Sequence, residues 1–137
     1  MRYVFDTNVL ISALLLPDSK PRRALDLALA RGKLLLSFAV LAELYDVLNR
    51  RQFRRYVDEE DIRRFLDALT REAQWVEPTA AIKVCRDPDD DKILDLAMSG
   101  AASFVVTGDS DLLALHAYQG IDILSPAQFL ELQLLQT

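Results

Sequence analysis

Four acidic residues that lie far apart in the sequence stand close to the ends of predicted strands or the starts of predicted helices. They are Asp6, Glu43, Asp90 and Asp109. Asp6 directly follows the apolar run 3–5, where an unpaired carboxylate is disfavoured. Carboxylates gathered in one place repel each other unless a cation offsets their charge or some of them bind protons. This pattern indicates a site that holds a cation.

Other metal-ligating residue types are scarce. Cys85 is the only cysteine, which excludes an internal disulfide and a thiolate metal cage, and we expect it to be a packed, unreactive residue. His116 is the only histidine and has no evident catalytic partner in the sequence. An all-oxygen ligand set favours a hard cation, Mg²⁺ or Mn²⁺. Such an ion can activate a water and offset charge when phosphate esters react.

Each carboxylate also has a simpler explanation. Asp residues cap helices and stabilise the positive helix end by about 0.3–1 kcal/mol, which would serve equally well for Asp89, Asp91 and Asp111. Glu43, taken alone, is more often a solvated side chain. Only the joint pattern of four acids favours a shared site over four local roles.

Strand patterns alternate with helical patterns along the chain, which predicts a parallel sheet with helices on both faces. In such a sheet the carboxyl ends of the strands share one edge, where ligands bind. Residues 80–86 remain undecided between a helical turn and an extended segment. Predicted strands are 2–5, 34–36, 103–107 and 121–124, with an extended piece at 75–77. Predicted helices are 9–16, 19–32, 38–50, 59–73, 89–100, 109–120 and one starting at Ser125; Ser19, Ser37 and Asp58 are the expected caps.

Length and composition set the broad class. The 137 residues, 51% of them apolar, fit one domain spanning 1–137 with its own core. The apolar runs fall far short of the ~20 residues of a membrane helix, and no signal-peptide pattern is present, so we expect a cytoplasmic protein without membrane contact.

The charge distribution is uneven. A net charge of −5 argues against a general nucleic-acid binder, but all 16 basic residues lie at or before Lys92. Four of them are candidates for guiding phosphate groups toward the acidic residues, although a solvated helix end explains them as well. These four are Arg50, Arg51, Arg54 and Arg55.

Four stretches, in this order, resemble the motifs of the PIN-domain ribonucleases, and most of all the VapC-type toxins of bacterial toxin–antitoxin systems. They are Val-Phe-Asp-Thr-Asn-Val-Leu at 4–10, Ala-Glu-Leu at 42–44, Asp-Pro-Asp-Asp-Asp-Lys at 87–92 and Val-Thr-Gly-Asp-Ser-Asp-Leu at 106–112. The resemblance covers essentially the whole chain. It implies an α/β fold, a PIN-like three-layer α/β/α sandwich with a central, mostly parallel sheet.

The resemblance also implies roles for residues. The catalytic residues that bind one or two metal ions would be Asp6, Glu43, Asp90 and Asp109, with Asp111 as an additional ligand. Asn8 and Thr107 would be supporting polar residues. Asp89 and Asp91 compete with Asp90 for the third position. Asp90 is preferred because residues 93–94 then begin the buried face of the helix.

The implied activity is that of a Mg²⁺- or Mn²⁺-dependent endoribonuclease, which hydrolyses RNA phosphodiester bonds with an activated water. The implied partners are RNA, a protein antitoxin and a second copy of the chain in a homodimer. One alternative is another Mg²⁺-dependent phosphoryl-transfer domain, but Asp6-Thr7-Asn8 lacks the second Asp two residues on. The other is a non-catalytic PIN-like module that binds RNA or protein, which the four filled acidic positions weaken.

Overall fold

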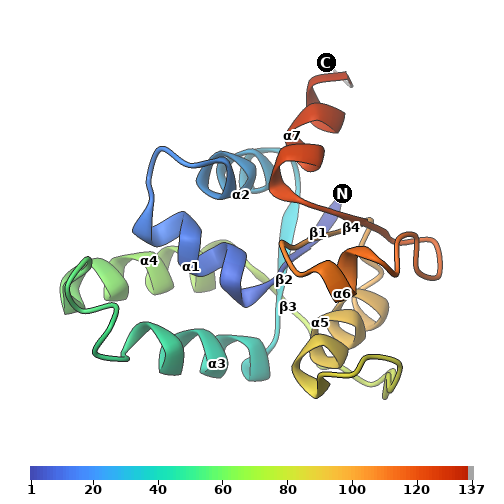
Figure 1. Cartoon of the computed structure of the whole chain (residues 1–137), viewed down its shortest axis with the longest axis horizontal. Coiled ribbons are helices and arrows are strands. Elements are labelled where there is room, and N and C mark those ends of the chain that lie inside the picture. Colours follow the sequence, from blue (N-terminus) through green and yellow to red (C-terminus); the bar gives the residue numbers. More distant parts are fainter. Residues whose placement is uncertain (136–137) are drawn as a thin grey trace.

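A five-stranded parallel sheet forms the centre of the computed structural model, which describes residues 1–135 (Figure 1). The strand order is β3-β2-β1-β4-β5, and each neighbouring pair is parallel. The first strand therefore lies in the middle, and Tyr3 pairs with both Leu34 and Phe104. The strands are β1 (Arg2–Phe5), β2 (Lys33–Leu36), β3 (Gln74–Trp75), β4 (Phe104–Val106) and β5 (Asp122–Leu124).

Helices cover both faces of this sheet. Successive strand side chains point to opposite faces, and apolar side chains on both faces must be buried. Tyr3 and Phe5 belong to one buried cluster, and Val4 belongs to the other. The first cluster packs under α1 (Thr7–Leu15), α2 (Lys20–Arg31), α3 (Phe38–Leu48), α4 (Glu59–Glu72) and α7 (Pro126–Leu135). The second packs under α5 (Pro88–Ser99) and α6 (Ser110–Leu113). The predicted three-layer α/β/α sandwich is confirmed.

The predicted helix starts are made by side-chain caps. Ser19, Ser37 and Asp58 each accept a hydrogen bond from the backbone N–H three residues later, at 3.3, 3.2 and 2.8 Å. Ser125 and Gln128 bond to each other's backbone N–H groups, so the predicted capping box at the start of α7 is confirmed. The caps at Ser37 and Ser125 fix where α3 and α7 leave the strands that precede them.

Most boundaries lie within about two residues of the prediction, and one helix end differs more. The helix expected to run to residues 118–120 ends at Leu113, because the chain then turns through Gln119 and Gly120, which have positive φ, and Tyr118 bridges to Ile121. The helix expected from Val9 already begins at Thr7. Among residues 1–135, no helix has the length and apolar character needed to span a bilayer.

Candidate metal centre at the sheet edge

Asp6 is held where the central strand meets the first helix. Its backbone N–H donates to the carbonyl oxygen of Val106 at 2.9 Å, and its own carbonyl oxygen accepts from Val9 and Leu10. The side chain is 8% exposed and makes no capping hydrogen bond. Instead the carboxylate accepts a 2.7 Å hydrogen bond from the Thr107 hydroxyl. Asp6 is thus a buried carboxylate rather than a simple helix cap.

Thr107 connects Asp6 with Asp109. It is fully buried, donates to Asp6 Oδ2 and accepts from the backbone N–H of Asp109 at 3.0 Å. Burial raises the pKa of Asp6, the Thr107 hydroxyl lowers it, and the nearby charge of Asp109 raises it again. Thr107, directly after β4, therefore links the side chain of Asp6 with the backbone of Asp109 at one edge of the sheet.

Three further carboxylates converge beside Asp6. One oxygen each from Asp90, Asp109 and Asp111 lies within 4.8 Å of the others. Asp90 is only 7% exposed, and burial followed by the charge of Asp109 raises its pKa to about 7. A hydrogen bond to Asp109 adds to this rise in the pKa of Asp90, as expected for a carboxyl group beside another carboxylate. An all-oxygen donor set of this kind fits Mg²⁺ or Mn²⁺.

The run of three acids at the start of α5 separates into different environments. Asp89 is exposed and pairs with Lys92 at 3.1 Å. Asp91 accepts the backbone N–H groups of Val84 and Cys85 at 3.0 and 2.9 Å, which lowers its pKa. Only Asp90 of the three is buried against Asp109. The geometry therefore supports Asp90 as the third ligand, which stays a prediction until binding is measured.

Glu43 approaches the cluster from α3 without joining the three-acid group. Its side chain is half-buried, and burial is the main cause of its raised pKa. The charges of Asp89 and Asp6 raise this pKa further, whereas Lys92 lowers it. Glu43 is therefore near enough to Asp6 for the charge of Asp6 to affect its pKa, as expected for a residue of the same site.

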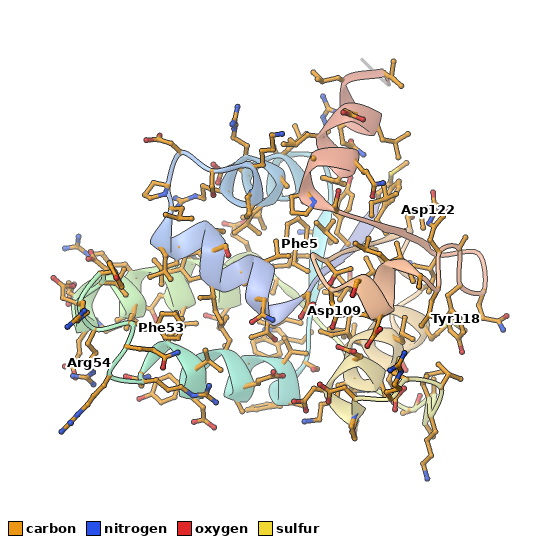
Figure 2. All side chains as sticks on the ribbon, viewed as in Figure 1. Phe5, Phe53, Arg54, Asp109, Tyr118 and Asp122 are labelled. Carbon is orange, nitrogen blue, oxygen red and sulfur yellow. The ribbon has the colours of Figure 1, made fainter. Side chains whose placement is uncertain are left out.

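The predicted supporting and guiding residues lie in different places. Asn8 is exposed on the first turn of α1 and lines a groove together with Asp109. The four arginines follow the far end of α3, where Arg54 pairs with Glu59 at 3.0 Å. Figure 2 shows Arg54 and Asp109 at well-separated places on the molecule. The arginines are thus not gathered at the carboxylates, and their guiding role stays a prediction.

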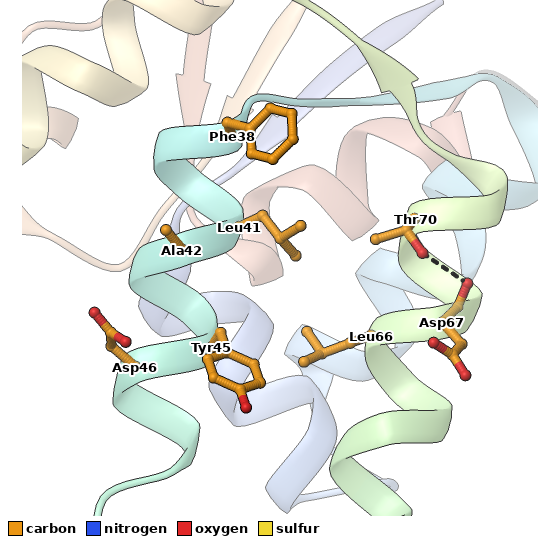
Figure 3. A pocket seen from close by; sticks show the side chains of 8 residues that line it. All are labelled: Phe38, Leu41, Ala42, Tyr45, Asp46, Leu66, Asp67 and Thr70. Carbon is orange, nitrogen blue, oxygen red and sulfur yellow. Dashed lines mark hydrogen bonds between the residues drawn. The ribbon is translucent and has the colours of Figure 1, made fainter.

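A separate apolar hollow of about 320 Å³ lies between α3 and α4 (Figure 3). Phe38, Leu41, Tyr45 and Leu66 are the large apolar residues that line it. The hollow contains none of the clustered carboxylates. It therefore offers no place for the metal chemistry.

The sequence interpretation missed several residues at the site. Ser12 lines the groove beside Asp109, and its position one helical turn after Asn8 on the same face could have revealed it. The buried Thr7 hydroxyl has no hydrogen-bond partner among residues 1–135, which no sequence pattern indicates. Asp91 accepts two backbone hydrogen bonds from residues 84 and 85, which lie in a segment whose structure the sequence did not predict.

Solved structures of other proteins share this fold. PAE2754 from Pyrobaculum aerophilum superposes with a TM-score of 0.65 at 20% identity, covering 98% of this chain and 90% of that chain. VapBC2 from Rickettsia felis was solved bound to a DNA fragment from its promoter. It superposes with a TM-score of 0.61 at 17% identity, covering 90% of this chain and 97% of that chain.

Sequence comparisons identify the family. The uncharacterized protein MJ1680 of Methanocaldococcus jannaschii is 34% identical over 119 residues, which are 85% of this chain and 76% of that protein. The family model described as PIN domain matches residues 2–111, a span that contains all the clustered carboxylates. The chain belongs to the PIN domain family.

Proposed function

We propose that the protein is a Mg²⁺- or Mn²⁺-dependent endoribonuclease that hydrolyses RNA phosphodiester bonds. The observation that carries this proposal is the convergence of buried Asp90 with Asp109 and Asp111, whose oxygens lie within 4.8 Å, beside Asp6 at the carboxyl edge of the sheet. PIN domains are generally nucleases, so family membership supports the same reaction class.

The residues divide the work by position. A bound cation would lower the pKa of a water and offset charge on the reacting phosphate. Asp90, Asp109 and Asp111 would hold that ion, while Thr107 orients Asp6 and fixes the backbone of Asp109. Glu43 would add its charge from the α3 side. Since Asp6 and Asp90 are buried, single-stranded or looped RNA, whose backbone can be splayed, suits the site better than a duplex.

RNA cleavage in the presence of Mn²⁺ tests this proposal. Asp6→Asn keeps an oxygen that can accept from Thr107 but loses the charge, so we expect cleavage to fall by at least about 100-fold. Asp46→Asn, an exposed acid on α3 outside the cluster, is the matched control and should cleave like wild type. Equal cleavage by wild type and Asp6→Asn, or none by wild type on a range of RNAs, would reject the nuclease.

We further infer that this nuclease is the toxin of a toxin–antitoxin pair, acting in the cytoplasm as a homodimer. The motif pattern and the shared fold with VapBC2 support the inference. Expression of wild type should arrest bacterial growth, and expression of Asp6→Asn should not. A soluble, RNA-cleaving protein that leaves growth unaffected would favour a role in RNA processing instead. Light scattering would test the dimer.

A further inference from the structure

An open groove of about 340 Å³ adjoins the carboxylate cluster and shares Asp109 with it. Its other walls come from the outer face of α1, the start of α2, the turn after β4 and the start of α7. The lining residues besides Asp109 are Asn8, Val9, Ser12, Pro21, Gly108 and Pro126. We propose that this groove binds the nucleoside next to the cleaved phosphate and so contributes to base preference. The proposal rests on the nuclease function proposed above.

The location of the groove makes this role specific. Any phosphodiester held at the clustered carboxylates carries a ribose and a base on each side, and these nucleosides would lie on the surface around the cluster. The groove lies on that surface, since Asp109 lines it. The apolar hollow between α3 and α4 shares no residue with the cluster.

The chemistry of the walls favours a neutral base over a phosphate. The groove contains no Lys or Arg, and its one charged residue is the acid Asp109. The side chains of Pro21 and Pro126, both half-buried, offer apolar surface for a base. A volume of about 340 Å³ falls within the ~300–1,000 Å³ typical of small-ligand sites. An uncharged, partly apolar ligand therefore fits best.

Two polar side chains remain free to read such a ligand. Asn8 and Ser12 lie one helical turn apart on α1, and neither side chain has a hydrogen-bond partner within residues 1–135. The Asn amide offers both donors and an acceptor, as base edges require. A Cβ placed on Gly108 would meet no atom within 4 Å, so the chain leaves free space at this wall.

Mononucleotide binding tests the proposal without any cleavage reaction, because a mononucleotide has no phosphodiester bond. We would titrate adenosine, guanosine, cytidine and uridine monophosphates, each with Mg²⁺, and follow Asn8 and Ser12 by NMR. Ribose 5-phosphate serves as the probe that lacks a base. The expected result is saturable shifts of Asn8 and Ser12 with at least one nucleotide and none with ribose 5-phosphate. Equal shifts with both would overturn the proposal.

Substitutions in the groove supply the matched comparison. Ser12→Trp fills the groove and should weaken nucleotide binding by about tenfold or more. Ala42→Trp, equally bulky but at the hollow between α3 and α4, should not weaken it. Asn8→Ala removes an exposed group without a partner and keeps the test open if Ser12→Trp does not fold. Unchanged nucleotide affinity in the folded groove variants would overturn the proposal.

Mn²⁺ titration separates the two levels of the account. A chain that binds Mn²⁺ and cuts RNA, but whose groove variants keep wild-type nucleotide affinity and base preference, retains the nuclease and loses the groove assignment. A chain that binds no Mn²⁺ loses the nuclease itself. An arginine-containing peptide that shifts Asn8 and Ser12 when nucleotides do not would make the groove a protein-docking surface, which contradicts the proposal.

Discussion

Thr107 shows what a single residue contributes to this site. The sequence resemblance implied a supporting role, and the structure shows contacts that suit it, since one buried hydroxyl bonds to Asp6 and to the backbone of Asp109. The sequence favoured Asp90 over Asp89 and Asp91 only through the position of the buried helix face, and the structure shows Asp90 as the buried one of the three. Adjacent residues on a helix differ by about 100° in direction, and only burial distinguishes which of three identical side chains faces Asp109.

Thr107→Val should therefore weaken the metal site while keeping the shape of the side chain. Asp6 loses a 2.7 Å hydrogen bond that orients it, so we expect Mn²⁺ affinity to fall about 10–100-fold. Isothermal titration measures this change. Thr70→Val, which removes a hydroxyl bonded to Asp67 on α4, is the control and should bind Mn²⁺ like wild type. Equal affinities in both variants would exclude an orienting role for Thr107.

Asp90 should make the metal-free protein less stable at higher pH. Its pKa is about 7 in the folded protein against an ordinary 3.8, so folding favours the protonated form. This stabilisation is complete below about pH 4 and is lost as pH rises toward about 7. The pKa values of Asp6 and Glu43 are also raised, so part of the pH dependence of stability should remain in an Asp90 variant.

Thermal unfolding in EDTA at pH 5 and pH 8 measures the contribution of Asp90. Asp90→Asn cannot ionise, so its melting temperature should fall less between these pH values than that of wild type. At pH 8 the variant should be the more stable of the two. A wild-type melting temperature that rises from pH 5 to pH 8 would contradict a raised pKa of Asp90 in the folded protein.

Cys85 should react slowly despite being the only thiol. Burial and a hydrogen bond to Asp91 raise its pKa to about 12, so almost no thiolate forms at pH 8. We expect Ellman's reagent to label the folded protein much more slowly than the protein in urea. Labelling at the same rate in both states would show that the segment around Cys85 opens freely.

At the scale of elements, α5 organises the segment that the sequence left undecided. Asp95 accepts the backbone N–H groups of Ala80 and Ala81 at 2.9 and 3.1 Å, and Ser99 accepts that of Thr79 at 2.9 Å. Residues 80–86 therefore have no regular structure of their own. Their shape depends on side chains of a later helix, which local periodicity cannot reveal.

Asp95→Ala should loosen this segment. The loss of its hydrogen bonds to Ala80, Ala81 and the Ser99 hydroxyl should lower the free energy of unfolding by about 1–3 kcal/mol. Hydrogen exchange at residues 80–81 should become faster. Asp67→Ala, an exposed acid on α4, should change neither quantity. Slow exchange at residues 80–81 in Asp95→Ala would show that other contacts hold the segment.

At the scale of the whole molecule, the order of strands and helices was predictable and the depth of the site was not. Alternating patterns predicted the parallel sheet, because a crossover helix must return each strand to the same edge. The groove beside Asp109 combines α1, Pro21, Gly108 and Pro126, which lie up to about 120 positions apart. Such a surface forms only when α2 and α7 pack against each other, so a linear pattern does not contain it.

The central claim is that the clustered carboxylates form one cation site, and Mn²⁺ titration of Asp109→Asn tests it most directly. Asn keeps an oxygen that can cap α6, so the fold should persist while the ligand charge is lost. We predict that wild type and Asp46→Asn bind Mn²⁺ with similar affinity. The Mn²⁺ affinity of Asp109→Asn should be lower by about a hundredfold or more. Equally tight binding by Asp109→Asn and Asp46→Asn would contradict the account.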